Sequence, residues 1–147
     1  MKLLLYSINY SPELTGIGKC NGDMVAEISA HNVETHVITA PPYYPEWKLH
    51  KGFKNWWSTE QAGGVTVYRC PLYIPKFPTA FKRILHLISF AKSSGFRLFS
   101  LFKLKPDVVF LVQPTLFCAP AALIYCKLTG AKSILHIQDF EVDAMFG

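Results

Sequence analysis

Short apolar runs alternate along the chain with longer stretches in which apolar residues recur at helical spacing. The first run covers residues 2–10. It is followed by a loop containing Pro12, Gly16 and Gly18, and then by helical periodicity over residues 19–31. A contiguous apolar run predicts a buried strand, and the proline and glycines predict a tight turn into the start of a helix.

The remaining elements repeat this alternation. The pattern predicts further strands at 35–39, 65–70, 108–112 and 133–137, and helices at 79–103 and 116–128. Asn32 and Gly130 are expected to end helices in the left-handed conformation. Residues 93–95, Ser-Ser-Gly, indicate a break within the long helix. No element is assigned to the polar stretch that ends at Gly63 and Gly64.

Strands that alternate with helices imply right-handed βαβ crossovers. The predicted fold class is therefore α/β, a Rossmann-like parallel sheet with helices on both faces. In such a sheet the loops that follow the strands share the carboxyl edge, where ligands bind. The prediction gathers five segments along this edge: 11–18, 41–47, 70–73, 113–115 and 138–143.

Two nucleotide-binding fingerprints fail in the first of these loops. Gly22 lies one residue too late to complete G-x-G-x-x-G, and the second strand ends without an acid for a ribose. The Walker A pattern is also absent. Gly18-Lys19 is followed by Cys20 and not by Ser or Thr, and no glycine lies at the required distance before Gly18. The unpaired N–H groups of a helix N-terminus still suit an anion, and a plain tight turn is the alternative.

Composition narrows the class of protein. The 147 residues are 50% hydrophobic, enough for one domain with a core, and the net charge of +5 does not indicate nucleic acid. An anionic lipid or a phosphorylated substrate would suit that charge. The four cysteines lack metal-ligand and redox spacings, which favours buried free thiols and no metal. No signal peptide is recognised, so a cytoplasmic location is expected.

The long helix at 79–103 has two interpretations. Its wide apolar face predicts packing on the core, and its charges exclude a membrane span. Its basic residues also fit an amphipathic helix that lies on a membrane surface. They are Lys82, Arg83, Lys92 and Arg97.

Three stretches at the predicted carboxyl edge carry a family resemblance. They read INYSPELTGIGK at 8–19, TAPPYYPEW at 39–47 and HIQDFEVD at 136–143. The chain resembles the N-terminal domain of family 4 glycosyltransferases, and in particular the bacterial exopolysaccharide enzymes of the colanic-acid fucosyltransferase type. The second and third stretches are specific, because long runs of unusual residues match in order.

The resemblance implies the N-terminal, acceptor-side half of a two-domain GT-B enzyme. Such an enzyme is a retaining, metal-independent glycosyltransferase that uses a nucleotide-diphosphate sugar and no cofactor. GDP-fucose is the expected donor. A lipid-linked saccharide is the expected acceptor, in exopolysaccharide assembly at the inner face of the plasma membrane.

The resemblance also bears on what residues 1–147 can do alone. They are expected to be a truncated N-terminal domain that lacks the C-terminal donor-binding domain and is inactive by itself. One alternative is a non-catalytic acceptor- or membrane-binding module. A Rossmann-like oxidoreductase is a further alternative, disfavoured by the missing ribose acid.

The resemblance assigns the reacting-sugar and phosphate sites by position. Asp139 matches the family's acidic residue that faces the reacting sugars and is the expected catalytic residue, with a helix cap as the alternative. Gly16 and Gly18 match the glycines of the donor-phosphate loop. Lys19 would add positive charge toward a diphosphate, although an exposed lysine without a role is the alternative.

Three aromatic residues form the expected acceptor rim. Tyr43, Tyr44 and Trp47 offer flat apolar rings with polar groups, which suit stacking on sugar faces. A proline-stiffened lid over the core is the alternative for this segment.

Overall fold

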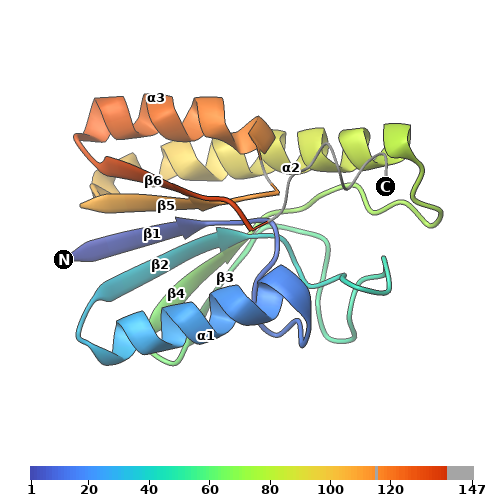
Figure 1. Cartoon of the computed structure of the whole chain (residues 1–147), viewed down its shortest axis with the longest axis horizontal. Helices are drawn as coiled ribbons and strands as arrows, with labels where there is room; N and C mark the ends of the chain where they lie inside the picture. The colour runs from blue at the N-terminus through green and yellow to red at the C-terminus, as the bar shows by residue number, and fades with distance from the viewer. Residues whose placement is uncertain (115, 139–147) are drawn as a thin grey trace.

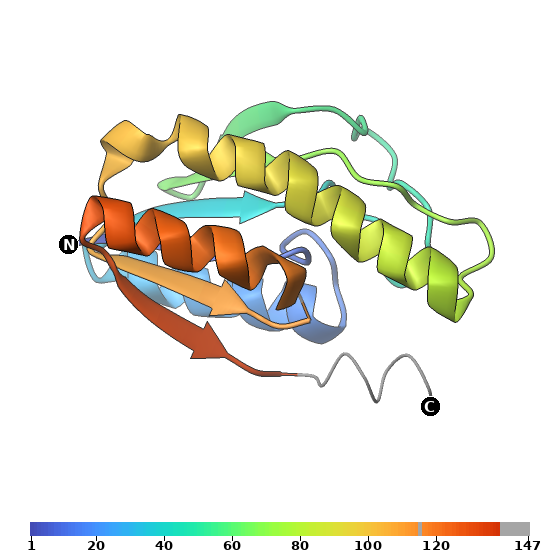
Figure 2. The ribbon, with the colours of Figure 1, turned by 90° about the horizontal axis from the view of Figure 1, so that it is seen from above.

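The computed structural model describes residues 1–114 and 116–138 and shows three layers (Figure 1). A six-stranded sheet lies in the middle, with α1 on one face and α2 and α3 on the other, and Figure 2 shows α2 and α3 side by side above the sheet. The elements are β1 Lys2–Tyr6, α1 Gly16–Ala30, β2 Glu34–Thr39, β3 Ser58–Ala62, β4 Val65–Arg69, α2 Ala80–Ser100, η1 Phe102–Leu104, β5 Val108–Val112, η2 Leu116–Cys118, α3 Ala119–Thr129 and β6 Lys132–His136. The predicted α/β fold with helices on both faces is confirmed.

Strand β1 lies inside the sheet, whose order is β3-β4-β2-β1-β5-β6. It pairs in parallel with β2 on one side and with β5 on the other. Its side chains alternate between two hydrophobic clusters: Leu4 and Tyr6 pack with Phe90 of α2, whereas Leu5 packs with Val25 of α1. Because both faces of the strand are covered, every position must be apolar, and this explains the continuous apolar run at the start of the chain.

Strand β3 was not predicted. It pairs antiparallel with β4 across a turn at Gly63 and Gly64, whose φ angles are 57° and 81°. Four of its five residues are exposed, so it lacks the alternation that identifies a half-buried strand. The glycine pair was the available signal, because hairpin turns of this kind need positive φ at both central residues. The sheet is therefore mixed, with an antiparallel edge strand, and not wholly parallel.

Helix α2 runs without interruption from Ala80 to Ser100, so the predicted break at residues 93–95 is wrong. The hydroxyls of Ser93 and Ser94 donate to the carbonyl oxygen of Phe90, one turn earlier in the same helix. Gly95 faces α3, where a Cβ would lie 3.9 Å from the Cβ of Ala121. These small residues therefore allow close packing inside a continuous helix.

Two helix-ending residues adopt the predicted left-handed conformation. Asn32 follows α1 with a φ of 61°. Gly130 caps α3 with a φ of 78°, and its N–H donates to the carbonyl of Cys126. Both predictions are confirmed, because these two residue types accept positive φ at low cost.

All four cysteines are free thiols. Cys70, Cys118 and Cys126 are buried, as predicted, whereas Cys20 on α1 is exposed. Burial raises the pKa of the Cys70 thiol to about 12. This thiol therefore stays protonated and packs as a small apolar side chain.

Arg69, at the end of β4, is 2% exposed, and its guanidinium connects three separate segments. Its Nη1 donates to the carbonyl oxygen of Ala40 after β2 (3.0 Å), and its Nη2 to that of Ser11 after β1 (2.7 Å). Nε and Nη2 also donate to the carboxylate of Glu60 in β3 (3.0 and 2.7 Å). One planar donor group thus sets the loops after β1 and β2 against the hairpin of β3 and β4.

Replacing Arg69 by leucine should lower the free energy of unfolding by about 3 kcal/mol, because two buried carbonyls and a carboxylate lose their partner. Urea unfolding followed by circular dichroism measures the loss. Lys54→Leu, at an exposed position before β3, is the control and should stay within about 0.5 kcal/mol of the parent. A loss for Arg69→Leu as small as that of the control would contradict this role.

Candidate functional site at the carboxyl edge

The loops after β1 and β2 meet at the carboxyl edge of the sheet, as predicted, whereas residues 115 and 139–143 of the predicted edge lie outside the described residues. The segment after β1 covers residues 7–15 and that after β2 residues 40–57. Backbone hydrogen bonds continue the ladders past the strand ends: the N–H of Ser7 donates to Ile38, and that of Ala40 to Ile8. The candidate site is therefore built on loops held by direct extension of the central strands.

Glu13 occupies the middle of this edge and is 3% exposed. Its Oε1 accepts from the backbone N–H groups of Tyr43 and Tyr44 (3.2 and 3.1 Å), and its Oε2 from the side-chain amide of Asn9 (3.0 Å). Burial raises the pKa of this carboxyl, and the three N–H donors act in the opposite direction by favouring the ionised form. The carboxylate ties the loop after β1 to the loop after β2.

The role of Glu13 was missed at the level of the sequence. Its signal was an acid placed between Pro12 and Gly16, in a loop where every buried backbone N–H needs an acceptor.

The two glycines of the predicted donor-phosphate loop play different parts in the structure. Gly16 begins α1 with a φ of 60°, and a Cβ there would lie 3.6 Å from the ring of Tyr44. Gly18 is buried, and a Cβ would lie 2.7 Å from the Cβ of Glu13 and overlap its Oε2. Gly18 thus makes room for Glu13, and Gly16 is the glycine that starts the helix.

The N-terminus of α1 has no side-chain cap. Thr15 stands at the N-cap position without a side-chain hydrogen bond to the helix, and the first turn holds no acidic residue. The N–H groups of this turn and the helix dipole therefore leave a position suited to an anion. Lys19 lies one turn in, exposed, and its ammonium is 2.6 Å from the carboxylate of Asp23.

The aromatic segment after β2 divides into buried and exposed residues. Tyr43 is 4% exposed, Trp47 is half-buried, and Tyr44 is exposed. The rings of Tyr43 and Trp47 lie 4.8 and 5.1 Å from the imidazole of His86 in α2. For Tyr43 this corrects the predicted acceptor rim, because its ring has no free face and the lid over the core describes it better. Tyr44 keeps the exposure that a rim residue needs.

His86 anchors this lid to α2. The carbonyl oxygen of Tyr73 accepts from Nδ1, so Nε2 of the neutral ring accepts from the hydroxyl of Tyr43 at 2.9 Å. Burial lowers the pKa of His86 to about 4. The ring is thus uncharged at neutral pH and joins three segments: α2, the loop after β4 and the loop after β2.

Asn21 of α1 connects the loop after β1 to the residues that follow β6. Its fully buried side-chain amide donates to the hydroxyl of Ser7 (2.9 Å) and to the carbonyl of Asn9 (3.0 Å). Its Oδ1 accepts from the side chain of Gln138 at 3.3 Å. Asp139, the predicted catalytic residue, lies outside the described residues.

Gln113 marks the carboxyl end of β5. Its backbone N–H donates to the carbonyl of His136 at 2.9 Å. Its side-chain nitrogen is buried and has no hydrogen-bond partner within the described part of the chain. Within residues 1–114 and 116–138, no three His, Cys, Asp or Glu side chains come together as a metal site.

The chain is homologous to a protein of Escherichia coli (strain K12) whose name describes it as the colanic acid biosynthesis glycosyl transferase WcaI. The two are 55% identical over 147 residues, which is 100% of this chain and 36% of the relative. The chain therefore spans about a third of the length of the curated relative that it matches. No family model matches the chain.

The fold matches the catalytic domain of starch synthase IV from Arabidopsis thaliana, in a structure bound to ADP and acarbose. The TM-score is 0.64, and the match covers 95% of this chain and 34% of that one, at 15% sequence identity. At this identity the likeness concerns the fold alone. It confirms the predicted GT-B type of sheet and helix arrangement.

Gly18→Ala should lower the free energy of unfolding by about 1–3 kcal/mol, because the added methyl group overlaps the buried carboxyl of Glu13. Gly95→Ala is the matched control, since it lies inside α2 with ordinary contact space, and it should raise stability by up to about 1 kcal/mol. Chemical denaturation of both variants provides the comparison. Equal or greater stability of Gly18→Ala would contradict the packing role.

His86 should make folding sensitive to acid. Its folded pKa of about 4 lies below the ordinary 6.5, so the unfolded chain binds more protons between these values. The contribution of the neutral His86 to the free energy of unfolding is fully present above pH 6.5. About 3 kcal/mol of it is lost as the pH falls to about 4.

His86→Gln tests this dependence, because glutamine offers an acceptor to Tyr43 and does not titrate. Unfolding free energies of parent and variant, measured from neutral pH to about 4, should converge toward the acid end. Because the pKa of Glu13 is raised, its contribution to the free energy of unfolding changes with pH in the opposite direction. This contribution is the same in parent and variant, so it cancels when their unfolding free energies are subtracted. Parallel curves would show that His86 does not titrate as described.

Proposed function

We propose that the chain is the acceptor-side domain of a retaining glycosyltransferase. The enzyme would transfer a sugar from a nucleotide-diphosphate donor, with GDP-fucose as the specific candidate, to a lipid-linked saccharide in exopolysaccharide biosynthesis. The observation that carries the proposal is the 55% identity, along the entire chain, to a relative named for colanic acid biosynthesis. The GT-B fold is consistent with it.

The start of α1 is the proposed neighbour of the donor diphosphate. Its uncapped N–H groups suit an anion, and Gly16 lets the backbone approach a phosphate without a side chain in the way. Lys19 would contribute little net charge there, because it is paired with Asp23. Gly18 does not face the ligand; its missing side chain leaves space for the buried carboxyl of Glu13, which holds the loop in place.

The acceptor is proposed to contact the exposed ring of Tyr44. This ring lies next to Gly16, so acceptor and donor diphosphate would meet at the same end of the edge. Tyr43 and Trp47 would act from beneath, by fixing the segment that carries Tyr44 onto His86. The side-chain amide of Gln113, whose nitrogen has no hydrogen-bond partner among the described residues, is a further donor at this edge.

Asp139 is the proposed catalytic residue. A carboxylate facing the reacting sugars would stabilise the positive charge that develops on the donor sugar or orient the attacking group. The reaction so proposed uses no metal and no cofactor. It needs the donor and acceptor held together in one oriented cleft, which accounts for much of the rate enhancement in such transfers.

The proposed setting is the cytoplasmic side of the plasma membrane, with peripheral contact, where a lipid-linked acceptor is reached. A non-catalytic acceptor- or membrane-binding module is the second candidate, and the exposed apolar stripe of α2 described below favours it. An oxidoreductase gains no support, because the first loop spans residues 7–15 and is not a tight glycine turn.

A chimaera tests the proposed function. In the E. coli relative, the segment matched by this chain is replaced by residues 1–147, and transfer of fucose from GDP-fucose to lipid-linked acceptor is followed by mass spectrometry. The chimaera should transfer sugar at a rate near that of the parent enzyme. Asp139→Asn in it should lower kcat by about 10² or more, because the carboxylate charge is lost at constant size.

The controls separate catalysis from folding. Glu27→Gln, at an exposed position further along α1, should leave kcat unchanged. A folded chimaera without transfer from any nucleotide sugar would overturn the proposed function and favour the binding module. Normal kcat with a lowered melting temperature in Asp139→Asn would identify a helix cap in place of a catalytic group.

A further inference from the structure

Helix α2 has an inner and an outer apolar face. Its buried residues, which include Phe90, Ser94 and Leu98, contact the core. On the opposite side an exposed stripe follows the helix at spacings of three and four residues. The stripe consists of Phe81, Leu85, Ile88, Lys92, Phe96 and Phe99, and it extends for about 27 Å at the helical rise per residue.

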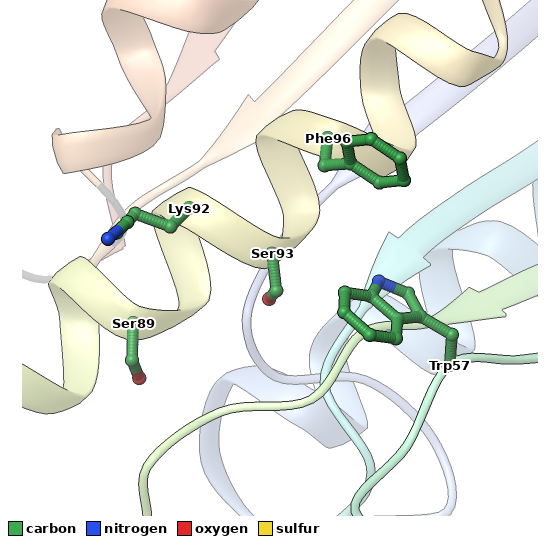
Figure 3. Close-up of a pocket in the computed structure, with 5 residues that line it drawn as sticks. All are labelled: Trp57, Ser89, Lys92, Ser93 and Phe96. Atoms are coloured by element: carbon green, nitrogen blue, oxygen red, sulfur yellow. The ribbon is translucent and has the colours of Figure 1, made fainter.

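Two tryptophans widen the apolar surface beside this stripe. Trp56 is 64% exposed and packs edge to face on Trp57 at 5.1 Å between ring centroids. Trp57 in turn faces Phe96 at 6.4 Å, across an open pocket of about 510 Å³. Figure 3 shows Trp57 opposite α2, whose Ser89, Lys92, Ser93 and Phe96 complete the lining. Contiguous exposed apolar side chains that are rimmed by polar residues mark a contact surface.

The sequence segment that contains α2 carries charges of one sign. Residues 61–106 contain eight lysines and arginines and no aspartate or glutamate, so this segment carries +8 while the rest of the chain carries −3. Arg69 is buried, and Arg83 and Arg97 lie over the rings of Trp47 and Tyr68. The lysines form no ion pair with any residue that the structure describes; they are Lys76, Lys82, Lys92, Lys103 and Lys105.

We infer that this surface of α2, together with Trp56 and Trp57, docks on an anionic lipid bilayer. Large apolar side chains along one helix face enter the boundary between headgroups and acyl chains, tryptophan favours that boundary, and lysines reach the lipid phosphates. No helix within the described residues is long and apolar enough to cross a membrane, so α2 would lie along the surface.

A second copy of the chain is a poorer occupant. A two-fold contact would bring the same basic surface of each copy together, and like charges would oppose it. Lysine is also depleted at the centre of protein interfaces. An anionic bilayer offers both the apolar layer and the opposite charge.

The inference rests on the peripheral membrane contact in the proposed function and assigns it to a surface. The Tyr43–His86 hydrogen bond holds the candidate site directly against α2. Docking through the outer face of α2 would therefore keep the carboxyl edge at a set distance from the bilayer that contains a lipid-linked acceptor.

Sedimentation with vesicles tests the inference, using residues 1–147 and no sugar substrate. The chain should bind vesicles of phosphatidylcholine containing a quarter phosphatidylglycerol, bind pure phosphatidylcholine far less, and be released by high salt. Lys82→Gln/Lys92→Gln should weaken binding by about 30-fold, since each lysine near an anionic surface contributes about the equivalent of a fivefold change. Lys127→Gln/Lys132→Gln, on α3 and β6, is the matched control and should bind as the parent does.

The apolar stripe has its own variant pair. Phe81→Ser/Phe96→Ser removes rings that are 69% and 73% exposed, so melting should be unchanged while vesicle binding falls by at least about tenfold. Leu14→Ser, at a position 83% exposed in the loop after β1, is the control and should bind as the parent does.

Three results would overturn the inference. The first is equal binding to both vesicle types, and the second is parent-like binding of the Phe81/Phe96 variant. The third is a parent chain that does not bind vesicles but forms a concentration-dependent dimer in ultracentrifugation, which the Phe81/Phe96 variant does not form. Because the assay contains no sugar, its failure would leave the transfer reaction untouched. Conversely, a chimaera that transfers no sugar would not alter vesicle binding.

Discussion

Buried backbone groups in the loops at the carboxyl edge must find hydrogen-bond partners, and two side chains of opposite charge meet this constraint. Arg69 donates to the carbonyls of Ser11 and Ala40. Glu13 accepts from the amides of Tyr43 and Tyr44. Each connects the loop after β1 to the loop after β2, one through its donors and the other through its acceptors. The remaining contacts of the edge, including the start of α1, are arranged around these two loops.

The same constraint explains why glycines and aromatic residues at this edge divide into supporting and exposed groups. Gly18 leaves space for the Glu13 carboxyl, and Tyr43 carries its hydroxyl to His86. Gly16 and Tyr44 lie above this layer and touch the solvent side. A site at this edge would thus present few residues to a ligand, on a support held by the hydrogen bonds of Glu13, Arg69 and His86.

Helix α2 has apolar residues on two opposite faces, one that packs on the core and one that is exposed. Its inner face packs on the sheet, and its outer face carries an apolar stripe that includes Lys92, which forms no ion pair with any described residue. Small residues make this possible, since Ser94 and Gly95 allow close contact with the neighbouring layer while larger rings point outward. The helix thus connects the candidate site, through His86, to the surface proposed to meet the bilayer.

The sequence alone determined the order of most elements, because strands covered on both faces must be continuously apolar and helix ends require residues such as Asn32 and Gly130. It also placed the loops that follow the parallel strands on one edge, since parallel crossovers leave no other arrangement. The comparisons confirmed the relation to colanic acid enzymes that three short stretches had indicated.

Tertiary structure decided what local patterns do not contain. β3 exists through pairing with β4 and a glycine turn, although its own residues are polar. Glu13, Arg69 and His86 acquire their roles from partners up to 58 residues away, so no spacing rule reveals them. The division between the buried Tyr43 and the exposed Tyr44 likewise depends on which ring meets α2. Side-chain burial and hydrogen bonding are set by distant elements, and only the folded chain brings those elements together.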